Sequence, residues 1–231
     1  MFDSVTPAPR IKICCIANAA EVALAVDAGA SALGLVSAMP SGPGTIPDGL
    51  IAHLARLTPL PALSVLLTSR TTTDDIIEQQ HRCRASVLQL CDAVTPDTRN
   101  ALRNALPGIR IMQVVHITDA AAIAEAREAS KFSDGLLLDS GQPRAALRSL
   151  GGTGRTHDWE ISRAIRAAVG LPVFLAGGLT AENVGEAIRR VRPFGVDVCS
   201  GVRTEGKLDP EKLRGFVTAV RQAEIEACET G

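Results

Sequence analysis

The chain alternates short β-branched or apolar runs with amphipathic segments of helical period, and this alternation occurs eight times. A helix after every strand favours a parallel sheet, because the helix returns the chain to the edge where the next strand begins. The expected strands are 11–15, 32–36, 62–67, 86–90, 111–116, 135–139, 173–176 and 195–199. The expected helices are 19–28, 48–57, 73–83, 96–106, 120–130, 159–169, 181–191 and 209–227.

Eight such units in 231 residues predict an α/β fold, a single closed (β/α)8 barrel of the TIM type. A doubly wound open sheet is the alternative, but no GxGxxG motif follows the first expected strand. No linker or low-complexity segment divides the chain. We therefore expect a single domain over residues 1–231, with 1–9 and 228–231 as flexible termini.

The composition argues against several classes of protein. A net charge of −1 without a basic stripe argues against a nucleic-acid partner. The first ten residues hold no apolar signal segment, and apolar runs stay far below the roughly 18 residues of a membrane span, so we expect a cytoplasmic protein without a membrane partner. Six scattered cysteines without zinc-like spacing predict reduced thiols, no metal and no cofactor. The sequence does not distinguish a monomer from a homodimer.

In such a barrel the active site lies at the carboxyl ends of the strands. Two late turns there repeat a strand–glycine pattern, FLAGGLTAENV at 174–184 and VDVCSGVR at 196–203. Glycine allows the main chain to approach a ligand, and the loops after strands 7 and 8 form the usual phosphate site of the fold. We therefore expect Gly177, Gly178, Ser200 and Gly201 to bind a phosphate group; tight turns alone are the alternative.

Several stretches match one family in order along the chain: KICCIAN at 12–18, VLQLCD at 87–92, LLLDS at 136–140, GGTGRTHDW at 151–159, LAGGLTAENV at 175–184 and RPFGVDVCSGV at 192–202. They resemble the KICGIT, VQLHG, LLD and GGTGKTFDW motifs, and the late-strand motifs, of the phosphoribosylanthranilate isomerases. These are tryptophan-pathway enzymes built on this barrel. The resemblance covers residues 11 to about 222.

The resemblance implies an aldose–ketose isomerase that carries out an Amadori rearrangement of a small phosphorylated sugar. The aminoaldose ring opens and becomes a 1-amino-1-deoxyketose, which requires an acid at the ring oxygen and a base at the C2 proton. By resemblance the base is Cys14 and the acid is Asp139. The alternative for Asp139 is an Asx turn that caps the sixth strand.

Cys15 stands where the family has glycine. Because neighbours on a strand point to opposite faces, we expect Cys14 to face the barrel mouth and Cys15 to pack in the helical layer. Lys12 shares the face of Cys14. It either supplies positive charge to the Cys14 thiolate or forms a buried ion pair with Asp197.

Two further residues are expected to bind the substrate. Gln89 ends the fourth strand and binds either a sugar hydroxyl or, alternatively, loop carbonyls. Arg155 lies in the long loop 140–158, which is rich in Gly and small polar residues as mobile lids often are, and is expected near an anion. His157 and Asp158 are expected to cap the next helix.

The second long loop departs from the family pattern. It reads SAMPSGPGTIPD at 37–48 and holds no cation where the family carries the arginine expected to bind the anthranilate carboxylate. Losing a charge-assisted hydrogen bond of that kind removes about 1.5–3 kcal/mol. The equivalent positions are Pro43 and Gly44, and the replacement cation is sought in Arg70 or Arg203.

Other positions at the same mouth differ as well. The family His-Gly becomes Cys91-Asp92, a lysine on the fifth strand becomes Gln113, and the glutamate after SSGV becomes Arg203. Three functions therefore stay open: the family reaction, isomerisation of another phosphorylated aminoaldose, and non-catalytic binding of a sugar phosphate. The catalytic pair that the resemblance implies is intact, which argues against the third.

Overall fold

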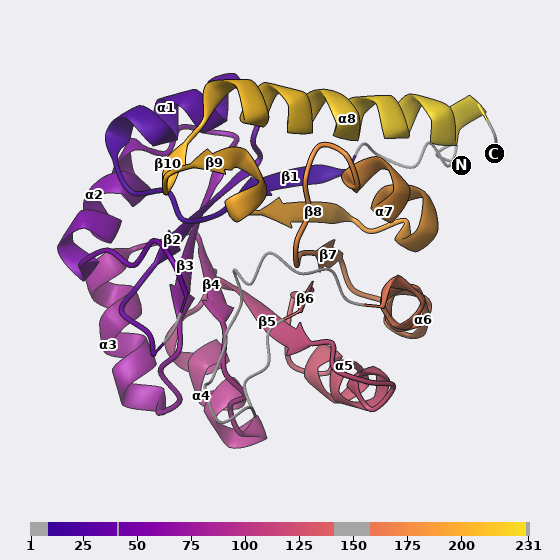
Figure 1. Cartoon of the computed structure of the whole chain (residues 1–231). Coiled ribbons are helices and arrows are strands. Elements are labelled where there is room, and N and C mark those ends of the chain that lie inside the picture. The colour runs from indigo at the N-terminus through magenta and orange to yellow at the C-terminus, as the bar shows by residue number, and fades with distance from the viewer. Residues whose placement is uncertain (1–8, 41, 141–157, 230–231) are drawn as a thin grey trace, which may run out of the picture.

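The computed structural model describes residues 9–40, 42–140 and 158–229, with the backbone alone described at 227–229 (Figure 1). Of the termini expected to be flexible, 1–8 and 230–231 lie outside the described residues. The last helix continues through Glu229.

The described residues form a closed barrel of parallel strands in the order β1 to β8, so the predicted barrel is confirmed and the open sheet is excluded. β8 closes the barrel against β1, with Lys12 directly paired to Asp197. The strands are β1 (Arg10–Ile13), β2 (Ala32–Val36), β3 (Leu63–Thr68), β4 (Val87–Leu90), β5 (Arg110–His116), β6 (Gly135–Asp139), β7 (Val173–Leu175) and β8 (Gly195–Val198).

A helix follows each strand and covers the outside of the barrel (Figure 1). The expected cap at Asp158 is present, because its side chain accepts a hydrogen bond from Glu160 N. The Thr95 side chain likewise accepts a hydrogen bond from Thr98 N, just before Pro96 begins its helix. The helices are α1 (Ala19–Asp27), α2 (Asp48–Leu57), α3 (Thr73–Cys83), α4 (Pro96–Ala105), α5 (Ala122–Ser130), α6 (Trp159–Ala168), α7 (Val184–Val191) and α8 (Pro210–Glu229).

The apolar core has two parts. The larger part lies between strands and helices and includes Leu33, Leu35 and the buried Trp159. The smaller part fills the barrel interior and includes Val36, Met112, Phe174 and both cysteines that follow β1.

In the part of the chain that is described, no helix combines the length and apolar character needed to cross a membrane.

Two features at the barrel mouth differ from the expectation. β1 ends at Ile13, two residues before the predicted end at 15, although Cys14 N still donates to Val198 O at 2.8 Å. After β8 the chain forms a short 3-10 helix, η1 (Ser200–Val202), and then a hairpin of β9 (Arg203–Thr204) and β10 (Lys207–Leu208). This hairpin lies beside α1 (Figure 1).

Candidate active site

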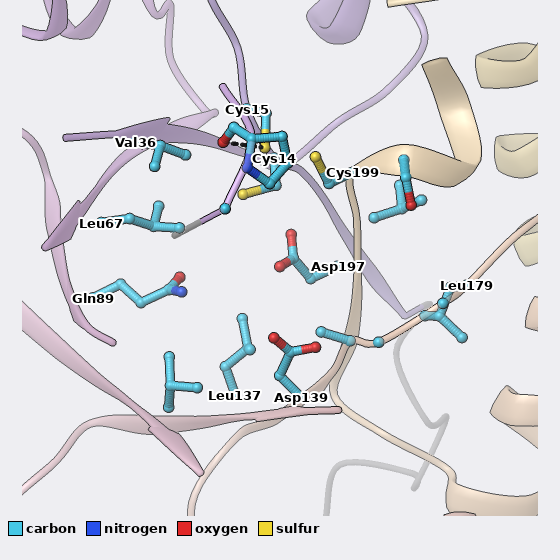
Figure 2. Close-up of a pocket in the computed structure, with 18 of the residues that line it drawn as sticks. Cys14, Cys15, Val36, Leu67, Gln89, Leu137, Asp139, Leu179, Asp197 and Cys199 are labelled. Atoms are coloured by element: carbon cyan, nitrogen blue, oxygen red, sulfur yellow. Dashed lines mark hydrogen bonds between the residues drawn. The ribbon is translucent and has the colours of Figure 1, made fainter. Parts of the chain in front are cut away.

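A cavity at the carboxyl ends of the strands contains the residues assigned to acid and base chemistry (Figure 2). It holds about 670 Å³ of empty space, including the part that is open to solvent. Its wall includes Cys14 after β1, Gln89 on β4, Asp139 at the end of β6 and Asp197 on β8. Both members of the expected catalytic pair therefore open into the same space.

Asp139 is a buried carboxyl group in this wall, with 6% of its surface exposed. Its Oδ1 accepts a hydrogen bond from Ser140 N at 2.8 Å. Asp139 therefore makes a local contact at the end of the sixth strand and also lines the cavity. Burial raises the pKa of Asp139, and the nearby carboxylate of Asp197 raises it further, against the opposing effect of His116. A carboxyl group that keeps its proton above its usual range is suited to donate it.

Lys12 and Asp197 form a buried ion pair with an Nζ–Oδ1 distance of 2.9 Å. Burial alone would lower the pKa of Lys12, but the Asp197 carboxylate and Cys14 together raise it above its usual range. A Cβ atom placed on Gly34 would lie 2.8 Å from Cys14 Sγ and 3.2 Å from Lys12 Nζ. The two expected roles of Lys12 are therefore compatible, because its ammonium group is paired and also lies near the Cys14 sulfur.

The prediction that Cys15 packs in the helical layer is wrong. Cys14 and Cys15 both line the cavity and both belong to the apolar cluster inside the barrel. Strand alternation fails here because β1 ends at Ile13 and Cys15 takes a left-handed φ of 64°. A left-handed conformation costs a residue other than glycine roughly 1–2 kcal/mol, so other contacts must hold Cys15 there.

Cys15 connects the end of β1 to the second loop and to the last strand. Its Sγ lies 3.6 Å from Pro43 O, and a Cβ placed on Gly44 would lie 2.5 Å from Cys15 Cβ. Figure 2 shows its sulfur between those of Cys14 and Cys199. The nearby sulfurs of Cys14 and Cys199, together with burial, raise the pKa of Cys15, so this thiol stays protonated at neutral pH.

The glycine loops occupy the adjacent part of the rim. Gly177 and Gly178 line the cavity with φ values of 84° and 63°, where glycine is favoured. Asn183 fixes this loop by donating to Gly178 O and accepting from Thr180 N, both at 2.9 Å. Ser200 lines the same cavity.

Gly201, the residue after Ser200, lies in an adjoining hollow of the surface. A Cβ atom on this residue would lie 2.0 Å from Leu179 O. Its lack of a side chain therefore allows η1 to contact the loop after β7, and the two glycine loops meet at this point.

The substrate-binding candidates have different outcomes. Gln89 is buried in the cavity wall, and its Nε2 donates to Cys91 Sγ at 3.9 Å instead of to a loop carbonyl. Its Oε1 has no hydrogen-bond partner among the described residues, which favours a contact with a sugar hydroxyl. Arg155 and His157 lie outside the described residues. Arg70 is half exposed and pairs with Asp75, and Arg203 pairs with Glu21.

The structure adds Asp197 and Cys199 to the described cavity wall. Their positions on and just after the last strand, before Ser200, are the sequence signal that points to them. Among the described residues that line the cavity, none is Arg, Lys or His. The same described part of the chain contains no cluster of His, Cys, Asp and Glu suited to a metal ion.

Comparisons with known proteins point to one family. The family profile described as N-(5'-phosphoribosyl)anthranilate (PRA) isomerase matches residues 11–219. An N-(5'-phosphoribosyl)anthranilate isomerase of Haloferax volcanii is 37% identical over 216 residues, which cover 93% of this chain and 94% of the relative. The structure of the phosphoribosyl anthranilate isomerase of Thermococcus kodakaraensis is 30% identical with a TM-score of 0.76, covering 92% of this chain and 99% of that chain.

A second structure includes a ligand. It is a phosphoribosyl anthranilate isomerase in complex with reduced 1-(o-carboxyphenylamino)-1-deoxyribulose 5-phosphate. It is 25% identical to this chain with a TM-score of 0.75, and the match covers 93% of this chain and 99% of that one.

Proposed function

The chain belongs to the N-(5'-phosphoribosyl)anthranilate isomerase family, and we propose that it performs the family's aldose–ketose isomerisation with Cys14 as base and Asp139 as acid. The substrate is N-(5'-phosphoribosyl)anthranilate, and the reaction is a step of tryptophan biosynthesis. The observation that supports these roles most strongly is that Cys14 and Asp139 open from the ends of β1 and β6 into one cavity, with Gly177, Gly178 and Ser200 on its rim.

The sequence of proton transfers follows from the two side chains. Asp139 donates its proton to the ring oxygen of the aminoaldose, the bond from C1 to that oxygen breaks, and the nitrogen becomes an iminium. The thiolate of Cys14 then removes the proton from C2, and the electron pair of that bond neutralises the iminium. The resulting enol takes up a proton at C1 and loses the proton of its C2 hydroxyl group, which gives the ketone of the 1-amino-1-deoxyketose. The ammonium group of Lys12 lies beside the Cys14 sulfur.

The phosphate group of the substrate is assigned to the loops at 177–178 and 200–201. Main-chain groups at the left-handed Gly177 and Gly178 allow close approach, and Ser200 lies on the neighbouring segment of the wall. With the phosphate held there, the sugar extends across the cavity between Cys14 and Asp139, and Gln89 is placed to bind one of its hydroxyl groups.

The aromatic part of the substrate has an unusual environment. The described wall near Cys15 consists of Met39, Gly42 and Pro43, without a cation for the anthranilate carboxylate. This observation favours a second candidate, an isomerase of a phosphoribosylated amine whose aromatic group has no carboxylate.

A direct assay separates the two substrates. Purified enzyme is given phosphoribosylanthranilate, and loss of the substrate fluorescence is followed; phosphoribosylaniline is tested in parallel, with its product detected by mass spectrometry. Turnover of the anthranilate compound supports the family reaction, and turnover of the aniline compound alone supports the second candidate. Absence of turnover with both at high enzyme concentration would contradict the proposed chemistry.

The phosphate assignment predicts the effect of Gly201→Ala. The added Cβ would meet Leu179 O at 2.0 Å, so the two glycine loops must separate. We expect KM to rise about tenfold, equivalent to about 1.4 kcal/mol of binding, with a smaller change in kcat. The matched control is Gly170→Ala, where an added Cβ meets nothing within 4 Å. A lower kcat at unchanged KM would contradict the assignment.

A further inference from the structure

Arg203 is a buried arginine whose contacts converge on the two cysteines after β1. Its side chain is only 7% exposed. Nη2 donates to Cys14 O at 3.1 Å and to Cys15 O at 2.6 Å. Nη1 donates to Gly206 O at 2.9 Å in the turn of its own hairpin. The guanidinium group therefore joins the β9–β10 hairpin to the two peptide groups that flank Cys15.

Glu21 on α1 holds this guanidinium group in place. Its two carboxylate oxygens each lie 3.1 Å from an Arg203 nitrogen, and they also accept hydrogen bonds from Ala17 N and Leu208 N. Burial alone would raise the pKa of Glu21, but Arg203 and these N–H groups lower it, so the carboxylate stays charged. A fork held on both nitrogens by one carboxylate has a fixed orientation, which a lysine ammonium group would not have.

The neighbouring backbone needs such a contact. Cys15 has a φ of 64°, although it is not glycine, and the strand has already ended at Ile13. Cys14 N and Ile16 N bind Val198 O and Gly34 O, which fixes the chain on either side. The carbonyl groups between them are the ones that Arg203 binds, so this side chain orients the Cys14–Cys15 peptide and, together with Gly34 O, the Cys15–Ile16 peptide.

Two departures from the family motifs meet here. Cys15 replaces the glycine of KICGIT, and Arg203 replaces the glutamate that follows SSGV. Glycine adopts a left-handed conformation without a steric penalty, whereas cysteine does not. The glycine that favours the left-handed backbone at position 15 is thus absent here, and an arginine fork binds that backbone instead.

We propose that Arg203 is a positioning residue for Cys14: it holds Cys15 in its left-handed conformation and thereby aims the Cys14 thiol into the cavity. The proposal rests on the proposed role of Cys14 as the base. Arg203 itself does not line the cavity wall, so it acts through the backbone of the two cysteines and not through the substrate.

The experiment is a double-mutant cycle. Arg203→Lys retains the charge but removes the fork, and it is made in the wild-type chain and in the Cys15→Gly background. In the wild-type chain we expect kcat to fall about tenfold with little change in KM, because a small misplacement of a reacting group is costly. In the Cys15→Gly background we expect the same substitution to lower kcat less than about threefold, because glycine holds the conformation by itself. Arg189→Lys, in the exposed pair with Glu226, is the control.

An ion pair that only stabilises the fold would give equal losses in both backgrounds, and that result overturns the proposal, as does an unchanged kcat. If Arg203→Lys does not fold, Glu21→Gln is used in its place. The Arg203 guanidinium group then remains but loses the carboxylate that orients it. The loss of kcat caused by Glu21→Gln should again be smaller in the Cys15→Gly background. Activity retained by Cys14→Ala would instead contradict the proposed function. An inactive Cys14→Ala with a fully active Arg203→Lys would remove this inference alone.

Discussion

Replacing Cys14 by alanine is expected to lower kcat for phosphoribosylanthranilate by about 10²–10⁴-fold, the usual contribution of a positioned general base. The substitution removes the group that takes the C2 proton but leaves the phosphate loops at 177–178 and 200–201 in place. KM should therefore change little. The fluorescence assay with saturating substrate measures the loss directly, and Cys14→Ser should behave similarly because a hydroxyl group is a far weaker base.

The matched control for this prediction is Cys91→Ala. Cys91 is also a buried thiol inside the barrel, but it does not line the described cavity wall. Burial raises its pKa to about 12, so it is protonated at neutral pH and cannot act as a base. Its replacement should change kcat less than a few-fold. Similar losses for Cys14→Ala and Cys91→Ala would show that packing of the barrel interior, and not proton removal, explains the result.

The barrel could be predicted from the sequence because each of its elements repeats a local pattern. Apolar runs and helical periods mark each strand and helix, and Thr95-Pro96 and Asp158 act as local start signals for α4 and α6. The position of each strand end then follows from the fold, and it identified Cys14, Gln89 and Asp139 as residues of one mouth. These inferences depend on short stretches of chain and one topological rule.

The conformation of Cys15 could not be predicted in the same way. The alternation of side chains applies only while the chain is extended, and β1 ends before Cys15. The contacts that fix this residue come from Pro43 and Arg203, which are 28 and 188 residues away in the sequence. Such contacts have no local signature. The only signal was the coincidence of two departures from the family motifs, at Cys15 and at Arg203, which the sequence does not show to be in contact.

Asp139→Asn is expected to lower kcat by about 10²–10⁴-fold as well, because the amide has the shape of the carboxyl group but no acidic proton for the ring oxygen. The amide oxygen can still accept the hydrogen bond from Ser140 N, so the fold around β6 should persist. Thermal unfolding of the variant checks this. Asp119→Asn, an exposed carboxyl group after β5, is the control and should leave kcat unchanged.

The pH dependence distinguishes an acid from a residue that only binds the sugar. Because burial raises the pKa of Asp139, the wild-type enzyme should retain its acid above the pH at which an ordinary carboxyl group ionises, and kcat/KM should decrease as Asp139 loses its proton. This decrease should be absent from the residual activity of Asp139→Asn. If the variant lost activity but kept the same dependence, another group would titrate there, and Asp139 would bind the sugar without donating a proton.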